Sequence, residues 1–300
     1  MGSASTHVHL DPSRSPCDRA VVRSPLARRP IDFVATGPRP RGDAGEPDLA
    51  PGPEEDLSFL TGDWRLFQRK DGHRYSLDDL ATAWYAVTAA ERAELDVLRT
   101  LDLGCGIGSV LQMVAWAFPN TVSVGVEAQA VSVGLARRSV RYNGGEDRVT
   151  VREGDLRDAS TVPEGAVFDL VTGTPPYLPL GDGIVSDRVQ CGPCRFETRG
   201  GVADYVHAMA RTLAVNGRAA LCQATRDLDR VGAAVQEAGL TVLRRRDVHG
   251  RAGRPALFTL FELCRSPGNT AVEPPLIVRD GNGRRTADMI ALRERMGMPG

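Results

Sequence analysis

Short apolar runs alternate with longer amphipathic stretches along most of this chain. Apolar runs bounded by Gly, Pro or Asn are typical of buried strands, whereas apolar residues three and four positions apart are typical of helices. The pattern predicts strands at 63–69, 97–103, 121–126, 149–151, 167–172, 218–222, 241–246 and 256–263. It predicts helices at 75–93, 110–118, 128–142, 205–213, 228–238 and 286–296, and an edge strand at 276–278.

Regular alternation of strand and helix predicts an α/β fold, a Rossmann-like doubly wound sheet of seven strands with right-handed crossovers. Most of these strands are expected to run parallel, because a helix separates each from the next. The exception is near the C-terminus, where 241–246 and 256–263 follow one another without a helix. One of these two strands is therefore expected to run antiparallel.

Three segments are expected along the chain. Residues 1–56 are rich in Pro, Gly, Arg and Ser and are predicted to be disordered. Many arginines and few acids at the start resemble an organelle transit peptide, although Asp11, Asp18 and Asp32 favour a plain tail. Residues 57–265 are predicted to form the main domain, and 266–300 a C-terminal extension with a short docked helix.

Composition narrows the class of protein. Hydrophobic residues make up 42% of the chain, which is enough for a core, and the apolar runs are too short to span a membrane. The net charge of −1 makes any basic surface a local feature, and Lys70 is the single lysine, so no Walker phosphate loop is present. Six cysteines without a paired framework suit a reducing compartment, so we expect a cytoplasmic protein, or an organellar one if the source is eukaryotic.

A glycine turn after the strand at 97–103 is the first candidate site. Gly104, Gly106 and Gly108 alternate with Cys105 and Ile107 before the next helix begins. Glycines let the backbone approach a ligand closely, and the helix N-terminus directs its amides at the same place. The spacing is G-x-G-x-G rather than the dinucleotide pattern G-x-G-x-x-G. The structural alternative is a glycine-rich turn that binds nothing.

Acidic residues follow the neighbouring strands. Glu127 lies about twenty residues after the turn, where an acid in a nucleotide-binding fold accepts hydrogen bonds from ribose hydroxyls. Asp155 and Leu156 follow the third strand of the sheet, and Asp102 precedes the glycines. Asp102 is expected to orient the turn or an amino group of the ligand. Asp155 alone would be equally consistent with a solvated loop acid.

Two consecutive prolines mark the end of the strand at 167–172. Thr174, Pro175, Pro176 and Tyr177 form an extended, rigid segment, because proline fixes φ and restricts the residue before it. Such a segment presents a hydroxyl, a backbone carbonyl and an aromatic ring at one place. The structural alternative is a proline-rich turn that only ends a strand.

These motifs resemble those of a known family. Leu101-Asp102-Leu103-Gly104-Cys105-Gly106-Ile107-Gly108 resembles motif I of class I S-adenosylmethionine (SAM)-dependent methyltransferases, whose turn wraps the methionine half of the cofactor. Thr174-Pro175-Pro176-Tyr177 resembles motif IV of the amino-methyltransferases, which is usually Asn-Pro-Pro-Tyr. The resemblance implies SAM as cofactor, Asp155 near its adenine amine, and Thr174 to Tyr177 as catalytic residues.

From Tyr75 to about Arg265 the order of motifs resembles the bacterial tRNA1(Val) adenine-N6-methyltransferase group. That resemblance places Asp78 near the cofactor and implies transfer of a methyl group to adenine N6 in tRNA or other structured RNA. Thr174 in place of Asn, and the long loop from Gly181 to Gly201, depart from the group. A protein glutamine N-methyltransferase is the alternative enzyme, and a cofactor-binding scaffold without catalysis is the alternative that is not an enzyme.

Two further clusters carry weaker signals. Cys191 and Cys194 form a single C-x-x-C, and Cys222 or Cys264 would have to complete a zinc site, so no metal is expected. Arg244, Arg245 and Arg246, with Arg251 and Arg254, form a basic cluster that suits RNA phosphates or a solvated strand end. The resemblance to the tRNA methyltransferase group implies RNA as the partner, with a protein substrate as the alternative, and no membrane partner is expected. Nothing in the sequence predicts the oligomeric state.

Overall fold

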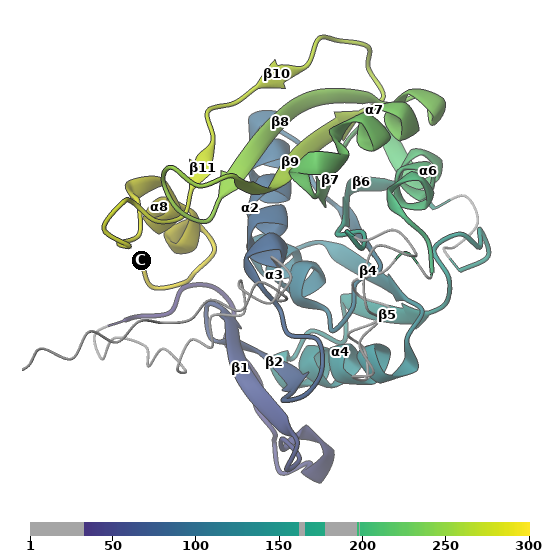
Figure 1. Cartoon of the computed structure of the whole chain (residues 1–300). Helices are drawn as coiled ribbons and strands as arrows, with labels where there is room; N and C mark the ends of the chain where they lie inside the picture. The colour runs from purple at the N-terminus through teal and green to yellow at the C-terminus, as the bar shows by residue number, and fades with distance from the viewer. Residues whose placement is uncertain (1–32, 162–165, 178–196, 198) are drawn as a thin grey trace, which may run out of the picture. The chain divides into compact units, whose positions relative to one another are not determined.

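The computed structural model describes residues 33–161, 166–177, 197 and 199–300, and residues 34–300 form one compact unit. Its strands are β1 (Glu55–Thr61), β2 (Trp64–Arg69), β3 (Arg99–Leu103), β4 (Val122–Glu127), β5 (Val149–Glu153), β6 (Phe168–Gly173), β7 (Leu213–Gln223), β8 (Thr241–His249), β9 (Ala256–Cys264), β10 (Ala271–Val272) and β11 (Leu276–Ile277). Its helices are α2 (Leu77–Arg92), α3 (Ser109–Ala117), α4 (Ala130–Asn143), α6 (Val202–Thr212), α7 (Leu228–Glu237) and α8 (Ala287–Arg295), with 3-10 turns η1 (Pro47–Leu49) and η2 (Thr225–Asp227) (Figure 1).

The main sheet confirms the predicted fold class. Within the described residues its strand order is β10-β8-β9-β7-β6-β3-β4-β5, and β11 also pairs with β8. The seven predicted strands are β3 to β9, of which β9 alone runs antiparallel, between β7 and β8. The strand predicted at 63–69 is β2, which pairs with β1 in a separate two-stranded sheet. The edge strand predicted at 276–278 is β11, which pairs in parallel with β8, and β10 is a further short strand that pairs in parallel with β8. Strands β4 and β5 lie on one side of β3, and the chain then returns to its other side to form β6 and β7. The carboxyl ends of the parallel strands β3 and β6 therefore lie at the switch point where α/β folds bind ligands.

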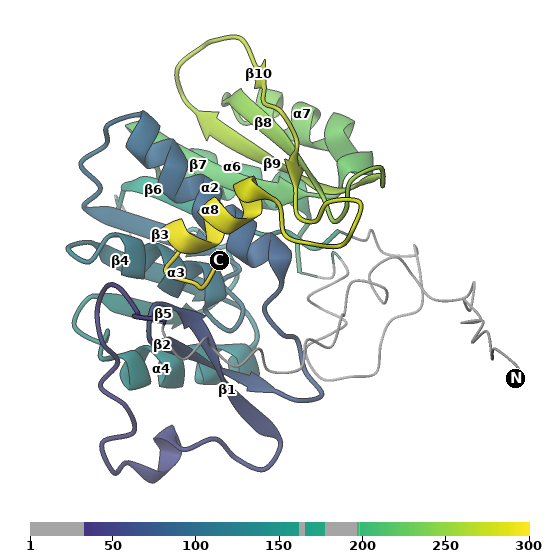
Figure 2. The ribbon, with the colours of Figure 1, turned by 90° about the vertical axis from the view of Figure 1, so that its left-hand side faces the viewer.

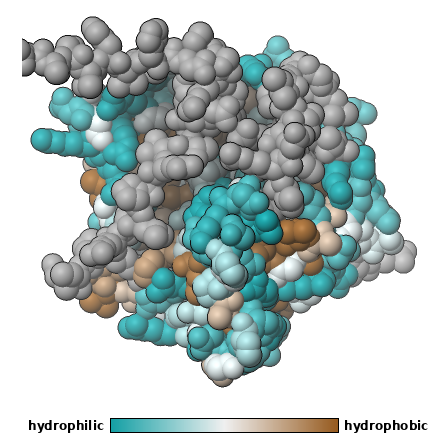
Figure 3. All heavy atoms as spheres, turned by 60° about the horizontal axis from the view of Figure 1, so that its bottom comes forward, coloured by the Kyte–Doolittle hydropathy of each residue, from teal (hydrophilic) through white to brown (hydrophobic). Residues whose placement is uncertain are grey.

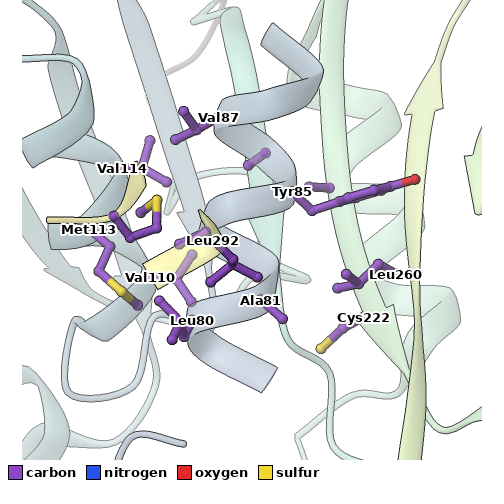
Figure 4. Close-up of a cluster of buried hydrophobic side chains, with 14 of the residues drawn as sticks. Leu80, Ala81, Tyr85, Val87, Val110, Met113, Val114, Cys222, Leu260 and Leu292 are labelled. Carbon is purple, nitrogen blue, oxygen red and sulfur yellow. The ribbon is translucent and has the colours of Figure 1, made fainter. Parts of the chain in front are cut away.

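Alternate side chains of the strands fill two apolar layers. Leu170, Ala220 and Leu260 pack into one layer with α2 and α3, whereas the next residues, Val171 and Leu221, pack with α6 and α7. This period of two is what a sheet covered on both faces requires. Figure 4 shows α2 at the centre of the first layer, with Ala81 and Tyr85 directed at the sheet and Leu80 beside Val110 and Leu292.

Ordered structure begins within the segment 1–56, which the sequence predicts to be disordered throughout. Of those residues, 34–56 belong to the compact unit and include η1 and the start of β1. The Gly42 amide donates to the Tyr142 carbonyl at 2.9 Å, and Arg39 pairs with Asp63 at 2.8 Å. These bonds join positions that are far apart in sequence, so no local periodicity reveals them. The remaining positions, 1–32, lie outside the described residues.

The C-terminal segment 266–300 joins the domain through backbone hydrogen bonds. Beyond the pairing of β10 and β11 with β8, the Gly62 amide donates to the Gly297 carbonyl at 3.0 Å and the Thr61 hydroxyl donates to the Met296 carbonyl at 2.5 Å. Helix α8 lies beside α2 (Figure 2). These bonds link the chain end to the turn between β1 and β2.

Helices of the described residues are all too short or too polar to cross a membrane. On the face displayed in Figure 3, hydrophobic areas are interspersed among hydrophilic side chains.

Trp116 of α3 holds the two ends of the domain in close contact. A Cβ added at Gly62 would lie 2.5 Å from the indole nitrogen of Trp116 and 2.6 Å from the Thr36 carbonyl, and one added at Gly297 would lie 2.6 Å from the same ring. Gly62 also has a φ of +50°. Only glycine therefore fits between the indole and the surrounding backbone.

We expect Gly62→Ala to lower the free energy of unfolding by about 2–4 kcal/mol, because it adds steric overlap to left-handed strain. Gly42→Ala is the matched control, since Gly42 has a φ of +82° but nothing within 4 Å of an added Cβ, and it should cost about 1–2 kcal/mol. Urea unfolding of both variants measures the difference. Equal losses would show that Trp116 adjusts to the extra methyl group.

Candidate active site

The glycine turn lies at the carboxyl end of β3, as predicted. Gly104, Gly106 and Gly108 have φ values of +61°, +55° and +86°, a region that other residues rarely adopt. A Cβ at Gly104 would lie 2.0 Å from the Tyr205 hydroxyl of α6, whereas one at Gly106 would have no heavy atom within 4 Å. The turn is thus packed tightly on one side and open at Gly106. This is the shape of a backbone cradle for a ligand.

Asp102 fixes the turn to the strand that carries the second motif. Its carboxylate accepts the Leu111 amide of α3 at 3.0 Å and the Thr172 hydroxyl of β6 at 2.7 Å. Gly108 is the N-cap of α3 and has no side chain to accept an amide, so Asp102 does so from β3. Burial raises the pKa of Asp102 to about 7, and these two hydrogen bonds lower it in part. Its observed contacts are to α3, which follows the turn, and to β6.

Glu127, at the end of β4, lies directly against the open part of the turn. One carboxylate oxygen accepts the Gly106 amide at 2.9 Å and the other accepts the Gln129 amide at 2.7 Å. The residue is 7% exposed, and burial raises the pKa of its carboxyl group. A further backbone hydrogen bond comes from Ala128. A carboxylate has about four acceptor positions, so some acceptor capacity remains after these bonds. The residues present fit a ribose with two hydroxyls beside the turn.

The other predicted cofactor residues divide into a buried pair and an exposed acid. Cys105 is buried and donates its amide to the Val126 carbonyl at 2.9 Å, and Leu156 packs against the same strand. Asp155 lies at the carboxyl end of β5 but is half-exposed and paired with Arg157 at 2.6 Å. Hydrogen bonds from Arg157 lower the pKa of Asp155. A contact between Asp155 and adenine remains a prediction that requires the Arg157 side chain to share the carboxylate.

The segment from Thr174 to Tyr177 directly follows the end of β6 at Gly173 and begins beside the glycine turn. Gly173 pairs with Leu103 across β3 and β6, so the two motifs leave adjacent strands at the same level. Pro175 is buried, and Thr174 and Pro176 are half-buried. The structure thereby brings Thr174 next to the turn that the sequence predicts to hold the cofactor.

Tyr177 is tied to the first helix of the domain. Its hydroxyl donates to Asp78 at 3.1 Å and lies 3.1 Å from the Cys222 sulfur. Burial, followed by the nearby charge of Asp78, raises the pKa of the Tyr177 hydroxyl well above its usual range. Asp78 also accepts the Ser76 hydroxyl. Asp78 thus contacts the segment from Thr174 to Tyr177. Its place near the cofactor stays a prediction.

Asp79 is a site residue that the sequence analysis missed. One of its oxygens accepts the Ser109 hydroxyl, in the first turn of α3, at 3.0 Å, and the other accepts the Ser76 amide at 2.8 Å. Burial, together with the charge of Asp78, raises the pKa of Asp79 to about 8. The spacing Ser76-x-x-Asp79 at a helix start was the available signal, because an acid at this position caps the N-terminus. The contact of Tyr205 with Gly104 had no such local signal.

The remaining predicted clusters have other roles or lie outside the described residues. Arg244 is 3.8 Å from the buried Glu262, and Arg246 pairs with Asp288 at 3.3 Å, so two members of the arginine triplet are occupied within the domain. Cys191 and Cys194 lie outside the described residues. Among those described, no cluster of three metal-binding side chains is present.

Residues 100–179 match a family described as "Methyltransferase domain". A release factor glutamine methyltransferase from Geobacter sulfurreducens is 37% identical over 83 residues, which is 27% of each chain. A tRNA1(Val) (adenine(37)-N6)-methyltransferase from Porphyromonas gingivalis is 30% identical over 80 residues, 26% of this chain and 31% of the relative. These matches therefore span only about a quarter to a third of the curated relatives.

The described fold resembles solved methyltransferase structures. A predicted O-methyltransferase from Agrobacterium tumefaciens superposes with a TM-score of 0.56 and 20% identity, covering 73% of this chain and 97% of that one. The likeness supports the Rossmann-like fold, with its antiparallel strand near the C-terminus. The methyltransferase match covers both the glycine turn and the segment from Thr174 to Tyr177.

The raised pKa of Asp79 gives stability a defined pH dependence. Between its unfolded and folded pKa values the native state binds the extra proton, so stability is greatest on the acid side and falls as the pH rises from about 5 to 8. We expect Asp79→Asn, whose amide can bond both Ser76 and Ser109, to reduce this slope by up to about 1.4 kcal/mol per pH unit. Urea unfolding across this range measures it. The exposed control Asp229→Asn should retain the wild-type slope, and a slope unchanged in Asp79→Asn would contradict the assignment.

Proposed function

We propose that the whole chain is a SAM-dependent N-methyltransferase. The support is residues 100–179, which match a methyltransferase domain whose methyl donor is SAM. The proposed acceptor is the exocyclic amine of a base, adenine N6, in tRNA or other structured RNA. The observation that carries this proposal is the register pair Leu103–Gly173, which sets Thr174 and the two prolines beside the glycine turn. Cofactor and acceptor sites at one strand switch point are what methyl transfer requires.

The cofactor side of the site has a distinct set of contacts. Glu127 retains acceptor capacity for ribose hydroxyls, and the backbone at Gly106 is open beside it. Asp102 and Asp79 hold α3 from two sides, through Leu111 and Ser109, so the amides at the helix start keep a fixed direction. When bound, SAM supplies an electrophilic methyl group on a positively charged sulfur.

The acceptor side must increase the nucleophilicity of a conjugated amine. Its lone pair is delocalised into the ring, and acceptors that bond its hydrogens draw the lone pair back onto nitrogen. We assign these acceptors to the Thr174 hydroxyl oxygen and the Pro175 carbonyl oxygen. Proline rigidity keeps both in place, and the Tyr177 ring, with its hydroxyl held by Asp78, offers a planar surface for a base.

A protein glutamine amide is the second candidate acceptor. The support is the sequence similarity to release factor glutamine methyltransferases, which is 37% over the matched 83 residues. An amide nitrogen is planar and conjugated like an exocyclic amine, so the same two acceptors would serve it. Incubation with labelled SAM and total RNA or total protein, followed by digestion and mass spectrometry, separates the candidates. Label in neither fraction would favour a scaffold without catalysis.

We expect Glu127→Gln to weaken SAM binding by about 1–3 kcal/mol, because the ribose hydroxyls lose charge-assisted acceptors. Glu153→Gln is the matched control, since Glu153 pairs with Glu127 across β4 and β5 but is exposed. Isothermal titration calorimetry with SAM measures both. Equal affinities in the two variants would remove Glu127 from the cofactor site.

We expect Thr174→Val to lower the methylation rate about tenfold to a thousandfold, because it keeps the shape and removes an acceptor used in the transition state. Affinity for SAM should hardly change. Thr174→Asn should preserve or raise activity, because the Asn oxygen is also an acceptor. Single-turnover methylation with labelled SAM measures the rates. A Val variant as fast as the parent would show that Thr174 only ends a strand.

A further inference from the structure

Exposed arginines gather at the carboxyl edge of the main sheet. Strand β8 is parallel to β7, because both run antiparallel to β9, so the loop after His249 lies on the same edge as the candidate site. Strand β11 pairs in parallel with the end of β8, so the turn that follows it lies there too (Figure 1). These two segments carry the exposed residues Arg251, Arg254, Arg279, Arg284 and Arg285, here called the edge arginines.

The charge of this surface is almost uncompensated. Residues 250–257 contain no acid, and residues 278–286 contain only Asp280. One oxygen of Asp280 accepts the amides of Asn282 and Arg284, each at 2.9 Å, so this oxygen already accepts two bonds from the turn. Burial, followed by the charges of Arg285 and Arg279, lowers the pKa of the neighbouring Arg293. Among the described residues no edge arginine pairs with an acidic side chain, and Arg285 donates to the Gly300 carbonyl at 3.0 Å, so a local excess of positive charge remains at this surface.

The two segments are held against one another. The Ala252 amide donates to the Arg279 carbonyl at 2.8 Å, and the Arg279 guanidinium donates to the Gly283 carbonyl at 2.7 Å. The Arg251 guanidinium lies against Gly283, where an added Cβ would approach it to 2.6 Å. The backbone thus spaces the charges in a defined arrangement, which lowers the entropy lost when they bind a ligand.

The edge arginines lie at the same edge of the sheet as the acceptor side of the candidate site, with β9 and β7 between β8 and β6. Thr259, near the start of β9, donates to Thr225 at 3.1 Å, and Arg226 next to it donates to the Tyr177 carbonyl at 3.2 Å. A chain of direct contacts therefore runs from the beginning of β9 to the segment that contains Thr174. A ligand that spans this edge would have one part on the arginines and another at the acceptor site.

We propose that the edge arginines bind the phosphate backbone of an RNA substrate whose target base lies at Thr174; this rests on the proposed function. Guanidinium groups bond phosphate oxygens in pairs, and an RNA chain presents phosphates at regular intervals. The net charge of the whole chain is −1, so this positive surface is local. It replaces the triplet Arg244 to Arg246 as the RNA-binding surface, because Arg244 and Arg246 are engaged with acids of the domain.

The test compares two triple variants of the full chain. The first is Arg251→Gln, Arg254→Gln and Arg284→Gln, whose side chains make no ion pair within the described ranges. The control, Arg99→Gln, Arg211→Gln and Arg265→Gln, removes the same charge from exposed arginines that lie outside the edge arginines and outside the triplet Arg244 to Arg246. The probes are a short RNA hairpin and a polyglutamate peptide of equal charge, measured by fluorescence anisotropy between about 50 and 200 mM salt.

We expect the slope of the logarithm of hairpin affinity against the logarithm of salt concentration to become shallower by about 2–3 in the first variant, because each lost phosphate contact contributes about 0.7–0.9. In the control the slope should change by less than about 1. SAM binding should be unchanged in both, which reports that they fold. Equal slopes in the two variants would overturn the proposal. So would polyglutamate that binds as tightly as the hairpin and loses as much affinity, because the partner would then be an acidic protein.

Failure of this surface differs from failure of the proposed function. RNA that is methylated equally well by the first triple variant and by the parent would refute the surface and leave the function intact. Salt-dependent hairpin binding through the edge arginines, without methyl transfer to any RNA, would leave the surface intact and refute the proposed acceptor.

Discussion

The candidate site depends on two hydrogen bonds that the buried Asp102 carboxylate accepts. This carboxylate joins β3, α3 and β6 through the Leu111 amide and the Thr172 hydroxyl, and so couples the glycine turn to the strand that carries Thr174. Burial raises its pKa to about 7, which means that the domain bears a cost for placing a carboxyl group there. An apolar residue would leave the first turn of α3 without its acceptor from β3. The free-energy cost of burying Asp102 is thus linked to the hydrogen bonds that position α3 after the glycine turn.

Helix α2 adds a second connection between the same two motifs. Asp79 accepts the Ser109 hydroxyl at the start of α3, while Asp78 accepts the Tyr177 hydroxyl. Adjacent residues at the start of one helix therefore contact both α3, which follows the glycine turn, and the segment from Thr174 to Tyr177. The rest of α2 is buried between the sheet and helices α3 and α8, which keeps that start in place. Packing far from the site thereby determines the relative position of its two halves.

The C-terminal segment contributes to both stability and surface charge. Its end bonds to the turn between β1 and β2 and packs Gly297 against Trp116. Its turn after β11 brings Arg279 and its neighbours to the edge of the sheet where the candidate site lies. The segment 266–300 therefore adds β10 and the predicted edge strand β11 to the sheet, and it carries part of the charge at that edge.

The sequence by itself determined the fold class, the order of strands and helices, an antiparallel strand near the C-terminus and the position of the glycine turn, because these follow from the hydrophobic period and from the conformational freedom of glycine. It also indicated Glu127 and the segment from Thr174 to Tyr177, since strand ends in such a sheet converge. Only the tertiary structure decided the contacts of Asp79 and Tyr205 with α3 and Gly104, the pairing of Asp155 with Arg157, and the engagement of Arg244 and Arg246 by acids. Most of these join residues far apart in the chain, and all depend on how side chains pack, which no local period encodes.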